Sequence, residues 1–134
     1  MAESLRQSSV ETRRKVLAGI AMLFGLVTIF AGTRVLRGAD PGYIVFRPLL
    51  LYNTVMGFVY AGVGVTIWRR LDPGRKGAAT IFLLNLLVLG AIVMVYLSGG
   101  AVAVESLRAM TLRTGVWLLL FLGLRRLGRR ADPG

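Results

Sequence analysis

The chain has 134 residues, of which 55% are hydrophobic, and its 17 Lys and Arg against 6 Asp and Glu give a formal net charge of +11. It contains neither Cys nor His. Disulfides, thiolate or imidazole metal sites, His-ligated haem and His-based acid/base catalysis are therefore excluded. The apolar residues fall in long runs and not at amphipathic spacing, which indicates that lipid is the solvent. We expect a small multi-pass membrane protein.

Three charge-free stretches, 16–33, 48–68 and 77–104, are each near the length that crosses a hydrocarbon core of ~30 Å. A fourth crossing must take Arg113 into the membrane, because few uncharged residues separate it from Arg125. The leucine-rich segment around Arg113 offsets most of the insertion cost of one Arg, about 2.5 to 3.5 kcal/mol. The predicted spans are 16–36, 48–68, 78–97 and 106–124.

The cationic residues predict the topology. Twelve of the 17 precede the first span, separate the second from the third or follow the fourth, and the other five lie toward the opposite side of the membrane. The positive-inside rule places the larger group in the cytoplasm. We therefore expect an all-α membrane protein with one domain, a four-helix bundle that runs up-down-up-down in a bacterial inner membrane, with both termini cytoplasmic.

Turn and cap residues predict where the helices begin and end. Asp40-Pro41-Gly42 and Asp72-Pro73-Gly74 have the composition of tight turns, and Ser98-Gly99-Gly100 breaks the third apolar stretch. Ser8 and Glu11 have the spacing of a capping box, which would start the first helix several residues before it enters lipid.

Small residues recur at intervals of three or four on the first two predicted helices. They are Ala21, Gly25, Thr28 and Gly32 on the first helix and Gly57, Ala61 and Gly64 on the second. Such stripes let two backbones approach closely. We expect the first two spans to pack together, and the same stripes also suit a homo-oligomer.

Polar residues of the second and third spans are predicted to face the interior of the bundle. Asn53 and Tyr60 are seven residues apart, and Asn85 and Tyr96 are eleven apart, so each pair returns to nearly the same helical face. We interpret these residues as forming hydrogen bonds between helices; the alternative is a ligand pocket.

Arg113 is the most unusual residue of the predicted spans. It lies at a depth similar to that of Asn53, ~8 to 10 Å from the same membrane face. Trp117, four residues further on, is a potential cation–π partner, and Glu105 is the nearest carboxylate on the same helix. We predict an outer polar layer that consists of Asn53, Glu105, Arg108 and Arg113, extended by Arg34 and Arg47.

Two interpretations of this layer differ in what neutralises Arg113. In the structural one, Glu105 neutralises Arg113, which braces the end of the fourth span and snorkels to the headgroups. In the functional one, the excess of Arg binds an anion, a lipid headgroup or a quinone-like head. Met56, Met94 and Met110 also lie in this outer half, where thioethers are potential Cu(I) ligands, although we favour their ordinary role as fillers of apolar gaps.

No catalytic motif is visible, and we expect neither enzymatic activity nor a cofactor. The leading hypothesis is a protein that acts through helix or lipid contacts, such as an accessory subunit of a membrane complex. The alternative is a small transporter or carrier that uses the Arg113 layer. The expected partners are membrane lipids and other membrane proteins. Nucleic-acid binding is not expected, because the cations are split among three clusters that flank the spans.

Overall fold

The structure is a computed structural model that describes residues 2–131. Within that range the chain forms four helices, α1 (Ala2–Leu36), α2 (Arg47–Arg69), α3 (Leu71–Leu97) and α4 (Val104–Ala131), and no strand. All four helices are long and apolar enough to cross a membrane. The prediction of an all-helical protein with four candidate membrane spans is confirmed, and each predicted span lies within one helix.

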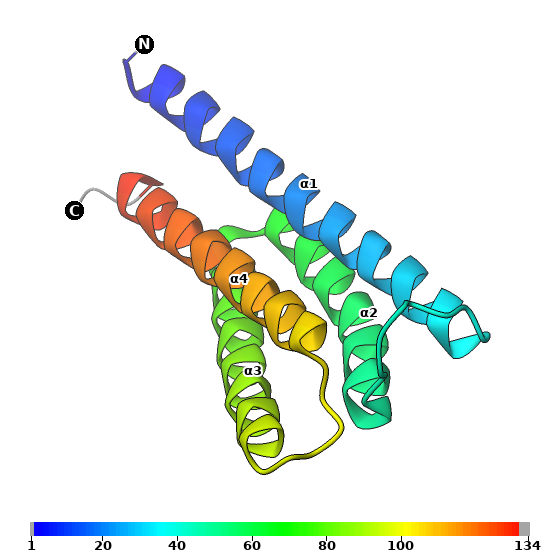
Figure 1. The fold of residues 1–134 in the computed structure, drawn as a ribbon. Helices are drawn as coiled ribbons and strands as arrows, with labels where there is room; N and C mark the ends of the chain where they lie inside the picture. Colours follow the sequence, from blue (N-terminus) through cyan, green and yellow to red (C-terminus); the bar gives the residue numbers. More distant parts are fainter. Residues whose placement is uncertain (1, 132–134) are drawn as a thin grey trace.

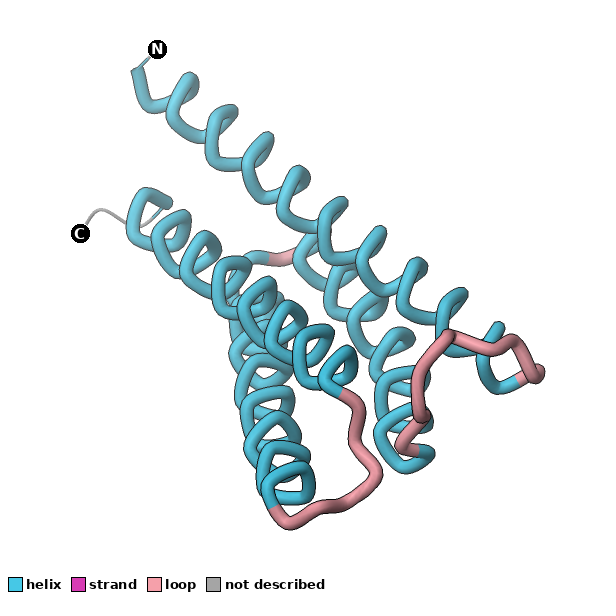
Figure 2. Tube along the Cα trace, in the orientation of Figure 1, coloured by secondary structure: helices cyan, strands magenta, loops and turns pink. Residues whose placement is uncertain are grey.

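The helices are arranged so that the start of α1 and the end of α4 lie on the same side of the molecule. Figure 1 shows the N-terminus and the C-terminal end of α4 on one side, and the loops that follow α1 and α3 on the other. Figure 2 shows these two loops in pink, together with the much shorter connection between α2 and α3. α1 packs most extensively on α2, and α3 packs next most extensively on α4.

Glycines allow α1 and α2 to pack with their backbones in contact. A Cβ atom added to Gly25 would lie 2.6 Å from the backbone nitrogen of Ala61 and 2.7 Å from the carbonyl oxygen of Gly57. A Cβ atom on Gly64 would lie 2.8 Å from the backbone nitrogen of Met22. The predicted packing of the first two spans through their small residues is confirmed.

The N-terminal helix begins earlier than its predicted cap. α1 starts at Ala2, so Ser8 lies inside the helix, where its carbonyl oxygen accepts a hydrogen bond from the Thr12 hydroxyl at 3.0 Å. Glu11 forms an ion pair with Arg14 at 3.8 Å. The capping-box prediction is wrong, because the helix already begins at Ala2. Ion pairs between residues three apart favour the helical conformation of this charged segment.

The two predicted Asp-Pro-Gly turns differ in the structure. Asp40-Pro41-Gly42 is a turn, in which the Gly42 N–H donates to Asp40 Oδ1 at 2.8 Å and Gly42 has a φ of +85°. Asp72-Pro73-Gly74 instead forms the first turn of α3, so its prediction as a turn is wrong. Proline suits a first helical turn because the N–H it lacks would have no helical acceptor there. Arg70 alone then connects α2 to α3.

A polar contact lies at the centre of the apolar core. Asn85 of α3 is fully buried, and its Oδ1 accepts hydrogen bonds from the hydroxyls of Tyr60 at 3.1 Å and Tyr52 at 2.9 Å. The predicted interhelical role of Asn85 and Tyr60 is thus confirmed. Tyr96 is 41% exposed, so its predicted interior position is wrong. It lies in the last turn of α3, beyond the buried stripe that ends at Ile92.

Large apolar side chains cover the outer surface of every helix. Leu23, Phe58, Leu87 and Leu119, one from each helix, are all exposed. In water such a surface would be unfavourable, because soluble monomers rarely expose large contiguous apolar patches. Lipid chains are the solvent that suits this surface, in agreement with the four candidate membrane spans.

Candidate functional site

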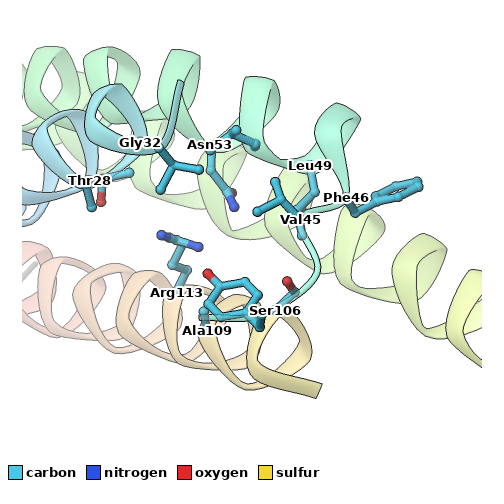
Figure 3. A pocket seen from close by; sticks show the side chains of 13 residues that line it. Thr28, Gly32, Val45, Phe46, Leu49, Asn53, Ser106, Ala109 and Arg113 are labelled. Carbon is cyan, nitrogen blue, oxygen red and sulfur yellow. The ribbon is translucent and has the colours of Figure 1, made fainter. Parts of the chain in front are cut away.

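A cavity of about 110 Å³ lies beside Arg113, between α1, α2, α4 and the loop after α1. We call it the Arg113 pocket, and its polar lining residues are Thr28, Tyr43, Asn53, Ser106 and Arg113. Figure 3 shows the guanidinium of Arg113 extending from α4 into this space, toward the side of the pocket formed by Asn53 and Thr28. The volume exceeds the ~30 Å³ that one water molecule occupies in the liquid, so a small polar group fits.

The pocket exists because the loop after α1 folds back between the helices. The Asp40-Pro41-Gly42 turn reverses the chain, and Val45 and Phe46 then cover one side of the cavity. Gly32 contributes no side chain to the opposite wall, where α1 lies directly against Thr54 of α2. Ser106 and Ala109 from the start of α4 complete the enclosure (Figure 3).

Arg113 has no anionic partner in the part of the chain that the structure describes. The ion pairs there are all between residues three apart on one helix, Arg6 with Glu3, Arg14 with Glu11 and Arg75 with Asp72. Arg113 is half-buried. Across the pocket, the Oδ1 atom of Asn53 is buried and receives no hydrogen bond from residues 2–131. The pocket therefore combines a cation without a counter-ion and an amide oxygen without a donor.

The structure brings together only part of the predicted polar layer. Asn53 and Arg113 share the pocket, as their matching depth predicted. Glu105 and Arg108 are exposed and do not line it. They lie eight and five residues before Arg113, which places them ~80° and ~140° around the helix from it. Their assignment to the layer is wrong, and the structural interpretation, in which Glu105 neutralises Arg113, is not supported.

The other predicted members of the layer also lie away from the pocket. Arg34 is exposed, with its guanidinium 5.7 Å from the centre of the Phe30 ring, and Arg47 is exposed at the start of α2. Neither lines the Arg113 pocket. Asp40, the remaining carboxylate near this end, accepts the hydrogen bond from Gly42. Arg113 is thus left as the cationic residue of the pocket.

Trp117 belongs to the core and not to a cation–π pair with Arg113. Its side chain is 0% exposed, and its ring centre lies 5.0 Å from that of Tyr60. Among residues 2–131 the cation–π contacts are those of Arg34 and of Lys15, which lies 5.3 Å from the Trp68 ring centre. The prediction of a cation–π contact is wrong, because the Trp117 ring packs against α2. Its Nε1 is buried without an acceptor in the described chain.

The three methionines considered for copper do not form one cluster. Met94 is 71% exposed on the outer surface of α3. Met56 and Met110 are buried, but they belong to two separate apolar clusters. This placement favours the role of apolar gap filler for both buried residues.

Sequence reasoning missed two residues that contribute to these polar contacts. The hydroxyl of Tyr52 donates to the same Asn85 oxygen as that of Tyr60. Tyr52 lies four residues before Met56 and eight before Tyr60, a spacing that would have predicted all three on one face of the helix. Tyr43 lines the Arg113 pocket from a loop. Helical periodicity carries no information about such a residue, because its position depends on how the loop folds.

No protein-family model matches this sequence, and no curated protein or solved structure is significantly similar to it. The class of the protein follows from its fold, an all-helical chain whose four helices are all candidate membrane spans. The most distinctive chemical feature of this protein is the pocket beside Arg113.

Proposed function

We propose that this protein is a non-enzymatic four-span membrane protein that binds an anionic group, either a small anion or a lipid headgroup, in the Arg113 pocket. One observation carries the proposal. Arg113 points into a cavity whose lining, among the described residues, contains no carboxylate.

The chemistry of the pocket supports an oxyanion ligand. A guanidinium presents several N–H donors in a planar fork that matches two oxygens of a phosphate or carboxylate. An unpaired cation inside a membrane is unfavourable, and a bound anion removes that penalty. The hydroxyls of Tyr43 and Ser106 and the amide of Asn53 supply further hydrogen-bonding groups to the same cavity. A neutral quinone-like head would use these groups but would leave the charge of Arg113 uncompensated.

We propose an up-down-up-down topology in a bacterial inner membrane, with both termini cytoplasmic. The imbalance of twelve cations against five supports this orientation. The position of the start of α1 and the end of α4 on the same side in Figure 1 supports an even number of crossings. In this orientation the Arg113 pocket lies toward the periplasm, since the loop after α1 lines it.

The orientation can be tested by cysteine labelling, because the chain has no Cys of its own. In intact cells, a membrane-impermeant maleimide should label Arg37→Cys in the loop after α1 and should leave Ser4→Cys unlabelled. Breaking the cells should make Ser4→Cys reactive. Labelling of Ser4→Cys in intact cells would contradict the proposed topology.

Binding by the pocket can be measured with Trp117 as the reporter. In a Trp68→Phe background, Trp117 is the single tryptophan and lies one helical turn from Arg113. We expect its fluorescence to change saturably with inorganic phosphate or with short-chain phosphatidylglycerol, and the stronger probe identifies the source of the anion. Arg113→Gln should weaken that binding about tenfold or more, since hydrogen bonds to charged groups contribute ~1.5 to 3 kcal/mol.

Arg108→Gln is the matched control, because Arg108 lies on the same helix but is exposed and outside the pocket. It should bind as the parent does. Equal weakening by Arg108→Gln, or no saturable signal with either probe, would contradict anion binding in the pocket. A saturable signal with a short-chain quinone alone would favour the neutral head instead.

A binding pocket of this kind suits an accessory subunit of a membrane complex, which acts through lipid and helix contacts. It also suits a small carrier that releases its ligand. Affinity purification from native membranes separates the two roles: an accessory subunit should retain partner proteins in stoichiometric amounts, whereas a carrier should be recovered alone. Recovery as a monomer under several mild detergents would count against the accessory role.

A further inference from the structure

A second cavity lies between α1 and α4, at the end of the molecule opposite the loops that follow α1 and α3. Its volume is about 310 Å³. We call it the α1–α4 groove, and it is lined by Thr12, Arg13, Val16 and Leu17 of α1 and by Gly123, Arg126 and Leu127 of α4. Figure 1 shows that α1 and α4 diverge toward the start of α1 and the end of α4.

The groove is cationic at its rim and apolar deeper in. Leu17 follows Arg13 by four residues, ~6 Å along α1, and Gly123 precedes Arg126 by three, ~4.5 Å along α4. Because the start of α1 and the end of α4 lie on the same side (Figure 1), both arginines lie on the terminal side of the apolar lining residues Leu17 and Gly123. The apolar residues line the next level down.

The two arginines at the rim are available for an external anion. Both are exposed, and neither forms an ion pair with a carboxylate of residues 2–131. The nearest acidic residue on α1, Glu11, pairs with Arg14 instead, at 3.8 Å. The occupant must therefore combine an anionic head, held by two guanidiniums, with an apolar part that lies against Leu17 and Gly123.

We propose that the α1–α4 groove binds an anionic glycerophospholipid of the leaflet that surrounds the termini. Its phosphate lies between Arg13 and Arg126, and an acyl chain fills the groove along Leu17 and Gly123. Charge-assisted hydrogen bonds to phosphate are the interactions that paired guanidiniums make best. Basic pockets between membrane helices recognise such headgroups. This site shares no residue with the Arg113 pocket, so each stands without the other.

The test is lipid binding by the full chain in a neutral detergent, measured by native mass spectrometry during titration with phosphatidylglycerol or phosphatidylcholine. We expect phosphatidylglycerol to bind preferentially. The double variant Arg13→Gln with Arg126→Gln should weaken its binding about 25-fold, because each Arg near a lipid phosphate contributes on the order of fivefold. The matched control is Arg37→Gln with Arg108→Gln, two exposed arginines at the other end, which should bind as the parent does.

A second variant tests the apolar part of the site with both arginines kept. A Cβ atom on Gly123 would lie 3.4 Å from Leu17, an ordinary contact, so Gly123→Ala should be tolerated whereas Gly123→Phe must fill the groove. Gly123→Phe should lose phosphatidylglycerol and Gly123→Ala should keep it. Retained binding by Gly123→Phe, or equal loss in the Arg37 and Arg108 control, would show general charge attraction and overturn the proposal. A lipid-free dimer would overturn it too, because a second copy would then cover the groove.

Discussion

Replacing Gly25 with Val should separate α1 from α2 and lower the free energy of unfolding by about 3 kcal/mol, the upper part of the range for overpacked cores. The expected effect is large because the atoms opposite Gly25 belong to the backbone. The Ala61 nitrogen and the Gly57 carbonyl oxygen would lie 2.6 and 2.7 Å from the new Cβ, and they cannot rotate away as a side chain would. Relief therefore requires the two helices to move apart along their whole contact.

Gly19→Val is the matched control, since it makes the same change on the same helix at a position where a Cβ would have no neighbour within 4 Å. Both variants carry the same change in helix propensity, so the difference between them measures the packing of α1 on α2. The free energies can be compared by unfolding in mixed micelles with increasing dodecyl sulfate. If the two variants were equally stable, the close backbone contact between α1 and α2 would be wrong.

The sequence predicts those features of this fold that depend on residues near one another along the chain. The spans are predictable because length and freedom from charge are local properties of each helix. The packing of α1 on α2 is predictable because Gly25, Gly57 and Gly64 repeat at helical spacing, and in lipid close packing contributes much of the attraction between helices. The prediction for Asp72-Pro73-Gly74 was wrong because the same residues suit both a tight turn and the first turn of a helix, so composition alone does not distinguish the two.

The sequence predicted the depth of the site residues along their spans, but it predicted only partly the side of the helix to which each residue points. Counting residues from the span ends placed Arg113 and Asn53 at one level, and both line the pocket. The same counting assigned Glu105 and Arg108 to the site although they point around α4 away from Arg113. Combining depth with the 100° rotation per residue would have excluded Arg108. The position of Tyr43 in the pocket could not be predicted, because it depends on how the loop after α1 folds.

The two cavities divide the positive charge of the chain into two roles. At the terminal end, the exposed Arg13 and Arg126 line the α1–α4 groove, where we propose that they hold an anionic lipid. At the loop end, Arg113 lies within its span and faces a small cavity of its own.

Trp117→Ala should be the most destabilising single truncation in the bundle. Trp117 is the largest fully buried side chain, and its ring packs against Tyr60 at the centre of the core. In soluble cores a truncation from Trp to Ala costs about 3 to 5 kcal/mol. Lipid removes part of the hydrophobic contribution but none of the lost contacts, so we expect about 3 kcal/mol here. Trp68→Ala is the control, because Trp68 is 44% exposed and should cost less than about 1 kcal/mol.

Trp117→Phe separates the packing of the indole from its N–H group. The Nε1 of Trp117 is buried without an acceptor in the described chain, and an unpaired donor costs about 1 to 3 kcal/mol. Phe keeps an aromatic ring against Tyr60 and removes this donor, so the gain should offset much of the lost volume. We expect Trp117→Phe to be within about 1.5 kcal/mol of the parent when unfolding is followed by circular dichroism. If Phe were as destabilising as Ala, the volume of the indole would outweigh its unpaired N–H, and the expected gain from removing that donor would be wrong.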